Sequence, residues 1–249
     1  MALGTMNTVK RGLTHLCTAH EPCVWGKWPT HGDFVRHNAT HAQAEFWLKW
    51  TDEYWHRRPQ RPDIPIAFVF PPGTTEFPSR NFVHGVIAPS QDKVGRLCPL
   101  VVFQEVTSRE MARMWPLEVD RSIDGGGRHM LYWWSRFVAA ANGSADLSKL
   151  ISDIEMVWHI YAPTFLEMLG GSLGVIDIAT LEKALANWQS ASQSDDAKKL
   201  KGVRRLPWSD WPSRLLRKSG AIPAYWMQDV HGGYVCASDG VLKMWGVRA

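Results

Sequence analysis

The alternation of apolar and polar residues predicts strands and helices in separate parts of the chain. Four short apolar runs, residues 23–28, 64–70, 82–88 and 99–106, are bounded by Pro, Gly and other turn formers, as buried strands are. Two further runs, 223–228 and 234–237, are joined through His231-Gly232-Gly233 and predict a hairpin near the C-terminus.

Helical periodicity is clearest over residues 40–56, where Thr40 is a suitable N-cap and Pro59 ends the pattern. The predicted buried face carries Gln43, Phe46, Trp47, Trp50 and Tyr54. Further helices are predicted over residues 108–116, 128–141, 147–168 and 178–188. Pro163 should kink or split the third of these.

These elements predict an α/β fold, in which a mixed β-sheet is covered by helices in a layered sandwich with a helix-rich second half. We expect a flexible N-terminal tail over residues 1–20 and a single domain over residues 21–249. Within that domain, residues 23–106 hold the core motifs and residues 107–220 form the helical second half. Residues 221–249 add the hairpin and a short helix.

Composition narrows the class of protein. The chain has 249 residues, 45% of them hydrophobic, which is enough for a substantial core. A net charge of +4 is too small to indicate a nucleic-acid-binding protein. There is no apolar run of transmembrane length and no signal-peptide pattern, so we expect a cytoplasmic protein without direct membrane insertion. The four cysteines have irregular spacings that do not resemble a disulfide framework.

The stretch from Gly85 to Leu100 contains a polar turn between two apolar runs. Its turn formers are Pro89, Ser90, Gln91, Asp92 and Gly95. The turn also carries three charged side chains, those of Asp92, Lys93 and Arg96. One interpretation is a solvated loop with a local ion pair that contributes at most about 1 kcal/mol. The other is a charged recognition surface on a rigid scaffold.

Motifs for nucleotide or anion binding are weak. Gly26-Lys27 is not a phosphate-binding loop, because the preceding glycine is missing and Trp28 replaces Ser or Thr. The glycines at 125–127 precede a predicted helix and could present N–H groups to an anion, but a glycine joint explains them more simply. We predict no cofactor.

Residues 170–174 match the G-x-S-x-G pattern of serine hydrolases, with Ser172 as the nucleophile and His231 downstream as a possible base. That mechanism requires a strand before the serine, whereas here a helix is predicted. A serine hydrolase that uses Ser172 is therefore the alternative function, and a helix C-terminal turn is the simpler interpretation. His31, His37 and His41 do not share a continuous helix, so no metal site is predicted.

Two segments together are more specific. Residues 26–35, GKWPTHGDFV, resemble the GK-x-P-x-x-GDF-[VI] opening of the TagF family of type VI secretion accessory proteins. Residues 89–100 are similar to the family's PS-x-D-x-VGR-x-x-PL segment. The matching positions are Gly26, Lys27, Pro29, Gly32, Asp33, Phe34, Pro89, Ser90, Asp92, Gly95 and Arg96. Phe46 and Trp50 resemble the family's F-x-x-x-WD helix, although Thr51 stands in the acidic position.

The resemblance implies a mixed α/β sandwich without enzymatic activity. It implies post-translational repression of type VI secretion through contact with the forkhead-associated-domain scaffold protein of the apparatus. Some family members are fused to a phosphatase domain, and this chain resembles the free-standing form.

The sequence also suggests how the two motifs cooperate. If both loops lie at one sheet edge, Lys27, Asp33, Asp92 and Arg96 should form charge-assisted bonds, with Arg96 as a possible bidentate donor. These charges either lock the loops together or contact a partner directly, and the two roles are compatible. Locked loops would present an aromatic patch. The expected members of that patch are Trp25, Trp28 and Phe34.

Overall fold

A computed structural model describes residues 20–56, 64–108, 110–111, 130–142, 144, 146–162, 177–189, 223–228, 234–238 and 240–244. The elements are β1 (Cys23–Gly26), β2 (Val35–His37), α2 (His41–Trp50), η1 (Thr51–His56), β3 (Ile66–Phe70), β4 (Phe82–Ala88), β5 (Leu100–Val106), α4 (Met130–Ala141), α5 (Leu147–Tyr161), α7 (Ile178–Gln189), β6 (Ala224–Gln228), β7 (Tyr234–Ser238) and α9 (Val241–Met244).

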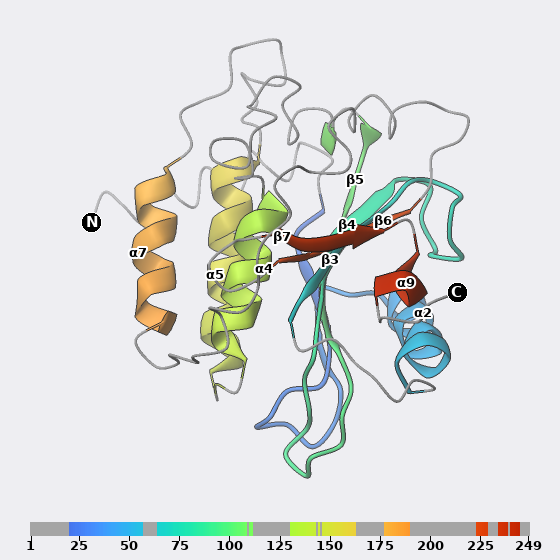
Figure 1. Cartoon of the computed structure of the whole chain (residues 1–249), viewed down its shortest axis with the longest axis horizontal. Helices are drawn as coiled ribbons and strands as arrows, with labels where there is room; N and C mark the ends of the chain where they lie inside the picture. Colours follow the sequence, from blue (N-terminus) through green and yellow to red (C-terminus); the bar gives the residue numbers. More distant parts are fainter. Residues whose placement is uncertain are drawn as a thin grey trace.

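The strands form one sheet in the order β2-β1-β5-β4-β3-β6-β7 (Figure 1). The α/β class, the helix cover and the helix-rich second half are confirmed. The sheet differs from the mixed sheet that we predicted, because every pairing among the described strands is antiparallel. The predicted hairpin exists as β6 and β7, and it joins the sheet beside β3.

The sheet separates two hydrophobic cores. Strand β3 shows the alternation, since Ala67 and Val69 face one core while Ile66, Phe68 and Phe70 face the other. Helices α4, α5 and α7 cover the first core, and α2, η1 and α9 cover the second. Figure 1 shows these two groups of helices on opposite sides of the sheet. The fold is therefore a three-layer sandwich.

The predicted helix over residues 40–56 is interrupted. Thr40 caps α2 as expected, and its hydroxyl and the Gln43 side chain form a reciprocal capping box. After Trp50 the chain continues as the π-helix η1. Buried Trp47, Trp50 and Trp55 anchor both segments on the second core.

Several predicted features lie outside the described residues. They are most of the N-terminal tail, the glycines at 125–127, Pro163, Ser172 and its G-x-S-x-G segment, and His231. Among the helices that the structure describes, none has the length and apolar character needed to cross a membrane.

Candidate functional site

The two motif segments form neighbouring loops at one end of the sheet. Residues 27–34 connect β1 to β2, and residues 89–99 connect β4 to β5. The loops leave the sheet side by side because Gly26 pairs with Leu100, which also pairs with Ala88. In Figure 1 they project together at the bottom of the view.

Asp92 is the centre of the charge cluster. Its Oδ1 accepts the backbone N–H groups of Val94 and Arg96, at 3.0 and 2.9 Å. Its Oδ2 accepts the Nε–H of Arg96 at 2.6 Å and lies 3.5 Å from Nζ of Lys27. Three of the four predicted charges therefore meet at one carboxylate.

These contacts keep the carboxylate ionised. Burial alone would raise the pKa of Asp92. The backbone N–H and guanidinium of Arg96, together with the N–H of Val94, outweigh this effect and lower the pKa to about 2. A general acid or base needs a pKa near the working pH, so this arrangement suits a structural ion better than proton transfer.

Four hydrogen bonds between the loops join them into one unit, and one of these runs from the Lys27 N–H to the Pro99 carbonyl at 3.3 Å. The Lys93 N–H donates to the His31 carbonyl at 3.0 Å, and Nη2 of Arg96 donates to the Gly32 carbonyl at 2.9 Å. The Ser90 hydroxyl donates to the carbonyl of Lys27 at 2.7 Å. Arg96 thus bridges a carboxylate and a carbonyl, and it does not bind a carboxylate in the bidentate manner that we considered.

Gly26 and Gly95 are each required to be glycine for a different structural reason. Gly26 has a φ of +136°, and a Cβ at this position would lie 2.1 Å from the Pro99 carbonyl oxygen. Gly95 has a φ of +84° in open space, where it lets the turn close between Asp92 and Arg96. The first glycine permits close packing of β1 on the second loop, and the second permits the turn.

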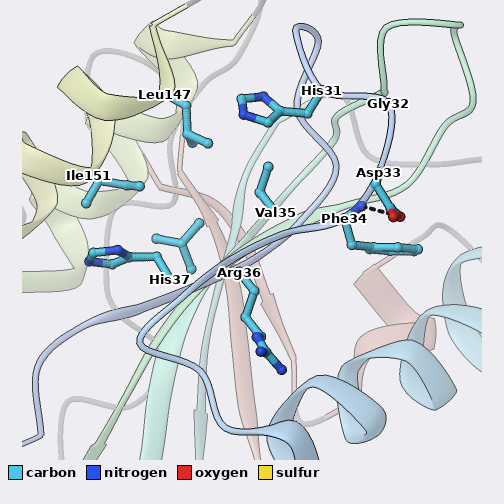
Figure 2. Close-up of a pocket in the computed structure, with 10 residues that line it drawn as sticks. His31, Gly32, Asp33, Phe34, Val35, Arg36, His37, Leu147 and Ile151 are labelled. Atoms are coloured by element: carbon cyan, nitrogen blue, oxygen red, sulfur yellow. Dashed lines mark hydrogen bonds between the residues drawn. The ribbon is translucent and has the colours of Figure 1, made fainter.

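Asp33 lies outside the charge cluster, contrary to our expectation. Its Oδ1 accepts the N–H of Phe34 at 2.8 Å, within its own loop (Figure 2). This short-range bond shapes the turn before β2. Nothing in the sequence separates Asp33 from Asp92, because both are acidic residues in a turn between strands.

The predicted aromatic patch is also wrong in two of its three members. Trp25 and Trp28 are buried, and they belong to different cores. Phe34 is exposed, with its ring stacked on Trp25 at 5.0 Å between centroids. The Nζ of Lys27 lies 4.2 Å from the centre of the Phe34 ring, which holds this side chain against the cluster.

A cavity of about 440 Å³ opens beside the first loop, between β2 and α5 (Figure 2). The rings of His31 and His37 face the apolar side chains of Leu147 and Ile151 across it. Nε2 of His37 lies 3.0 Å from Oε1 of Glu155 on α5. This pair ties the edge strand to the helical layer.

The three histidines of the first region have separate partners. His31 contacts Thr30, His37 contacts Glu155 and His41 contacts Glu45. Within the described residues, no group of three or more His, Cys, Asp or Glu side chains could hold a metal ion.

Sequence reasoning overlooked the exposed apolar residues of the second loop, Val94 and Leu97. Their signal was available, since they are large apolar residues inside an otherwise polar turn.

Comparisons with known proteins support the motif assignment. Residues 23–124 match the family model of the TagF N-terminal domain, which is described as type VI secretion system-associated. A search of curated proteins found no match. Among solved structures, the chain is similar to PA0076 from Pseudomonas aeruginosa PAO1, with 17% identity over 82% of this chain and 81% of that chain. The TM-score of this match is 0.34.

Proposed function

Because residues 23–124 match the family model of the TagF N-terminal domain, we propose that the chain is a non-enzymatic, cytoplasmic regulator of a bacterial type VI secretion system. In this proposal it represses secretion post-translationally, by binding the forkhead-associated-domain scaffold protein of the apparatus. The family match includes both motif loops, so the association with type VI secretion is its direct implication.

The locked loop pair is the observation that best supports binding over catalysis. Asp92 is held ionised by its bonds from Arg96 and the Val94 N–H, and its contact with Lys27 links the two loops. Preorganised loops lose little conformational entropy when a partner binds, which favours affinity. The pKa of Asp92, lowered to about 2, keeps this carboxylate ionised near neutral pH, so it is poorly suited to acid–base chemistry.

A binding measurement and a secretion measurement together test this function. The purified chain should bind the forkhead-associated-domain scaffold from the same genome at micromolar concentration, as measured by calorimetry. Deletion of the gene should raise type VI secretion, and the wild-type gene should restore repression. Absence of binding at that concentration, together with unchanged secretion after deletion, would refute the proposal.

A further inference from the structure

Exposed apolar side chains gather on the two motif loops. Four large hydrophobic residues are exposed in the described part of the chain: Phe34 (39%), Leu48 (45%), Val94 (65%) and Leu97 (50%). Three of the four belong to the loop pair, which projects beyond the sheet (Figure 1). Exposed apolar residues that gather in one region, rather than occur singly, indicate an interaction site.

These side chains stand on a fixed base. Phe34 is stacked on buried Trp25 and lies beside Nζ of Lys27. Val94 lies within the turn that Asp92 closes, and its own N–H is one of the bonds to that carboxylate. The apolar residues are therefore held in position before any partner arrives.

The surroundings of these side chains are positively charged. The two loops, residues 27–34 and 89–99, carry three Lys or Arg side chains and two Asp side chains, so their net charge is 3 − 2 = +1. The carboxylate of Asp92 is buried against its partners, whereas Lys93 and Arg96 are exposed on either side of Val94. The outward charge of the second loop is thus cationic, with Val94 between the two cations and Leu97 next to Arg96.

We propose that Phe34, Lys93, Val94, Arg96 and Leu97, here called the loop-tip surface, bind an acidic segment of the partner protein. Apolar side chains of that segment pack on Phe34, Val94 and Leu97, and its carboxylates pair with Lys93 and Arg96. This inference rests on the proposed function, in which the partner is the secretion scaffold. It adds the contact surface and the chemistry of the segment that the surface recognises.

Charge-reversing and charge-introducing variants test the loop-tip surface. Calorimetric titration with the scaffold protein measures the Kd of three loop variants, Val94→Asp, Leu97→Asp and Lys93→Glu. The matched controls are Leu48→Asp, at the exposed apolar residue on α2, and Lys183→Glu, at an exposed lysine on α7. Thermal unfolding of each variant establishes that it is folded.

Each loop variant should raise the Kd by at least about tenfold, because it places a carboxylate against an acidic segment. The controls should bind within about twofold of wild type, since a change outside an interface costs little affinity. Wild-type affinity should also fall as NaCl rises from about 0.05 to 0.5 M, because salt screens the exposed charges.

The outcomes separate this inference from the function on which it rests. If wild type binds the scaffold and the folded loop variants bind equally well, the loop-tip surface is refuted and the proposed function stands. Equal losses in the loop variants and in the controls would also refute it. If wild type does not bind the scaffold, the proposed function and this inference fall together.

Discussion

The Nζ atom of Lys27 lies 3.5 Å from Oδ2 of Asp92, and both side chains are almost completely shielded from solvent. The ammonium comes from the first motif loop and the carboxylate from the second. Since a buried ion is costly without its partner, each loop depends on the other for its stable conformation.

Neutralising Asp92 should destabilise the protein. Asp92→Asn leaves the buried ammonium of Lys27 without a counter-ion and weakens the bonds from the Arg96 side chain and the two N–H groups. We expect the Tm to fall by several degrees in a thermal melt monitored by circular dichroism. Asp52→Asn, at an exposed residue of η1, is the control and should melt like wild type. A wild-type melt for Asp92→Asn would show that the ion network does not stabilise the loops.

The same carboxylate should add to acid sensitivity at low pH. The pKa of Asp92 falls from an ordinary value of 3.8 to about 2 on folding, so the folded state favours the charged form. Its stabilising contribution is complete above about pH 4 and is lost as the pH falls towards 2. Urea unfolding over this window should show a smaller decline for Asp92→Asn than for wild type. Parallel curves would contradict the expected linkage.

Arg96 and Asp33 should differ, although both match the family motif. Arg96→Ala removes bonds to Asp92 and to the Gly32 carbonyl and should cost about 1 kcal/mol, a modest value because the side chain is largely exposed. Asp33→Ala removes one exposed bond to the Phe34 N–H and should cost less. Chemical denaturation measures both free energies of unfolding. An equal or larger loss at Asp33 would indicate a contact other than the one seen here.

His84 should make the free energy of unfolding depend on pH at higher pH values than Asp92 does. It is fully buried beside Gln104, and burial lowers its pKa from 6.5 to about 4. The unfolded chain therefore binds a proton between these values while the folded chain does not, so stability falls as the pH drops from about 6.5 to 4. The loss should not exceed about 3 kcal/mol. His84→Gln should flatten the urea-unfolding profile in this range, and an unchanged slope would exclude His84 as its source.

Gly26 and Gly73 provide a comparison of two glycines with positive φ. Gly26→Ala places a Cβ against the Pro99 carbonyl and should cost more than about 3 kcal/mol, because backbone must move. Gly73→Ala meets open space and should cost about 1 kcal/mol of conformational strain. Chemical denaturation of both variants separates steric overlap from strain. Equal losses would show that the approach of β1 to the second loop adapts easily.

The sequence predicted local elements better than their assembly. The run over residues 82–88 coincides with β4, because seven buried residues between turn formers leave few alternatives. Strand β2 was missed, since it has three residues and only Val35 is buried. The periodicity of the sequence does not indicate the π-helix after Trp50. This π-helix depends instead on the packing of Trp55 in the core.

The candidate site shows the same division. The motif residues lie in two neighbouring loops or, for Gly26, at the end of β1, and the meeting of Lys27, Asp92 and Arg96 was predicted from their charges. The sequence could not show that Asp33 bonds within its own loop, or that Trp25 and Trp28 are buried in different cores, because these outcomes depend on how the loops pack against the sheet.

The bond between Arg96 and the Gly32 carbonyl joins residues 64 positions apart. Contacts over such separations form only after a large loop has closed, so they appear late in folding. During synthesis, β1 must wait for β5 before the first loop can be fixed. A ribosome-bound chain that ends before β5 therefore cannot form the loop pair, so a partner that binds this pair can bind only chains whose synthesis has passed β5.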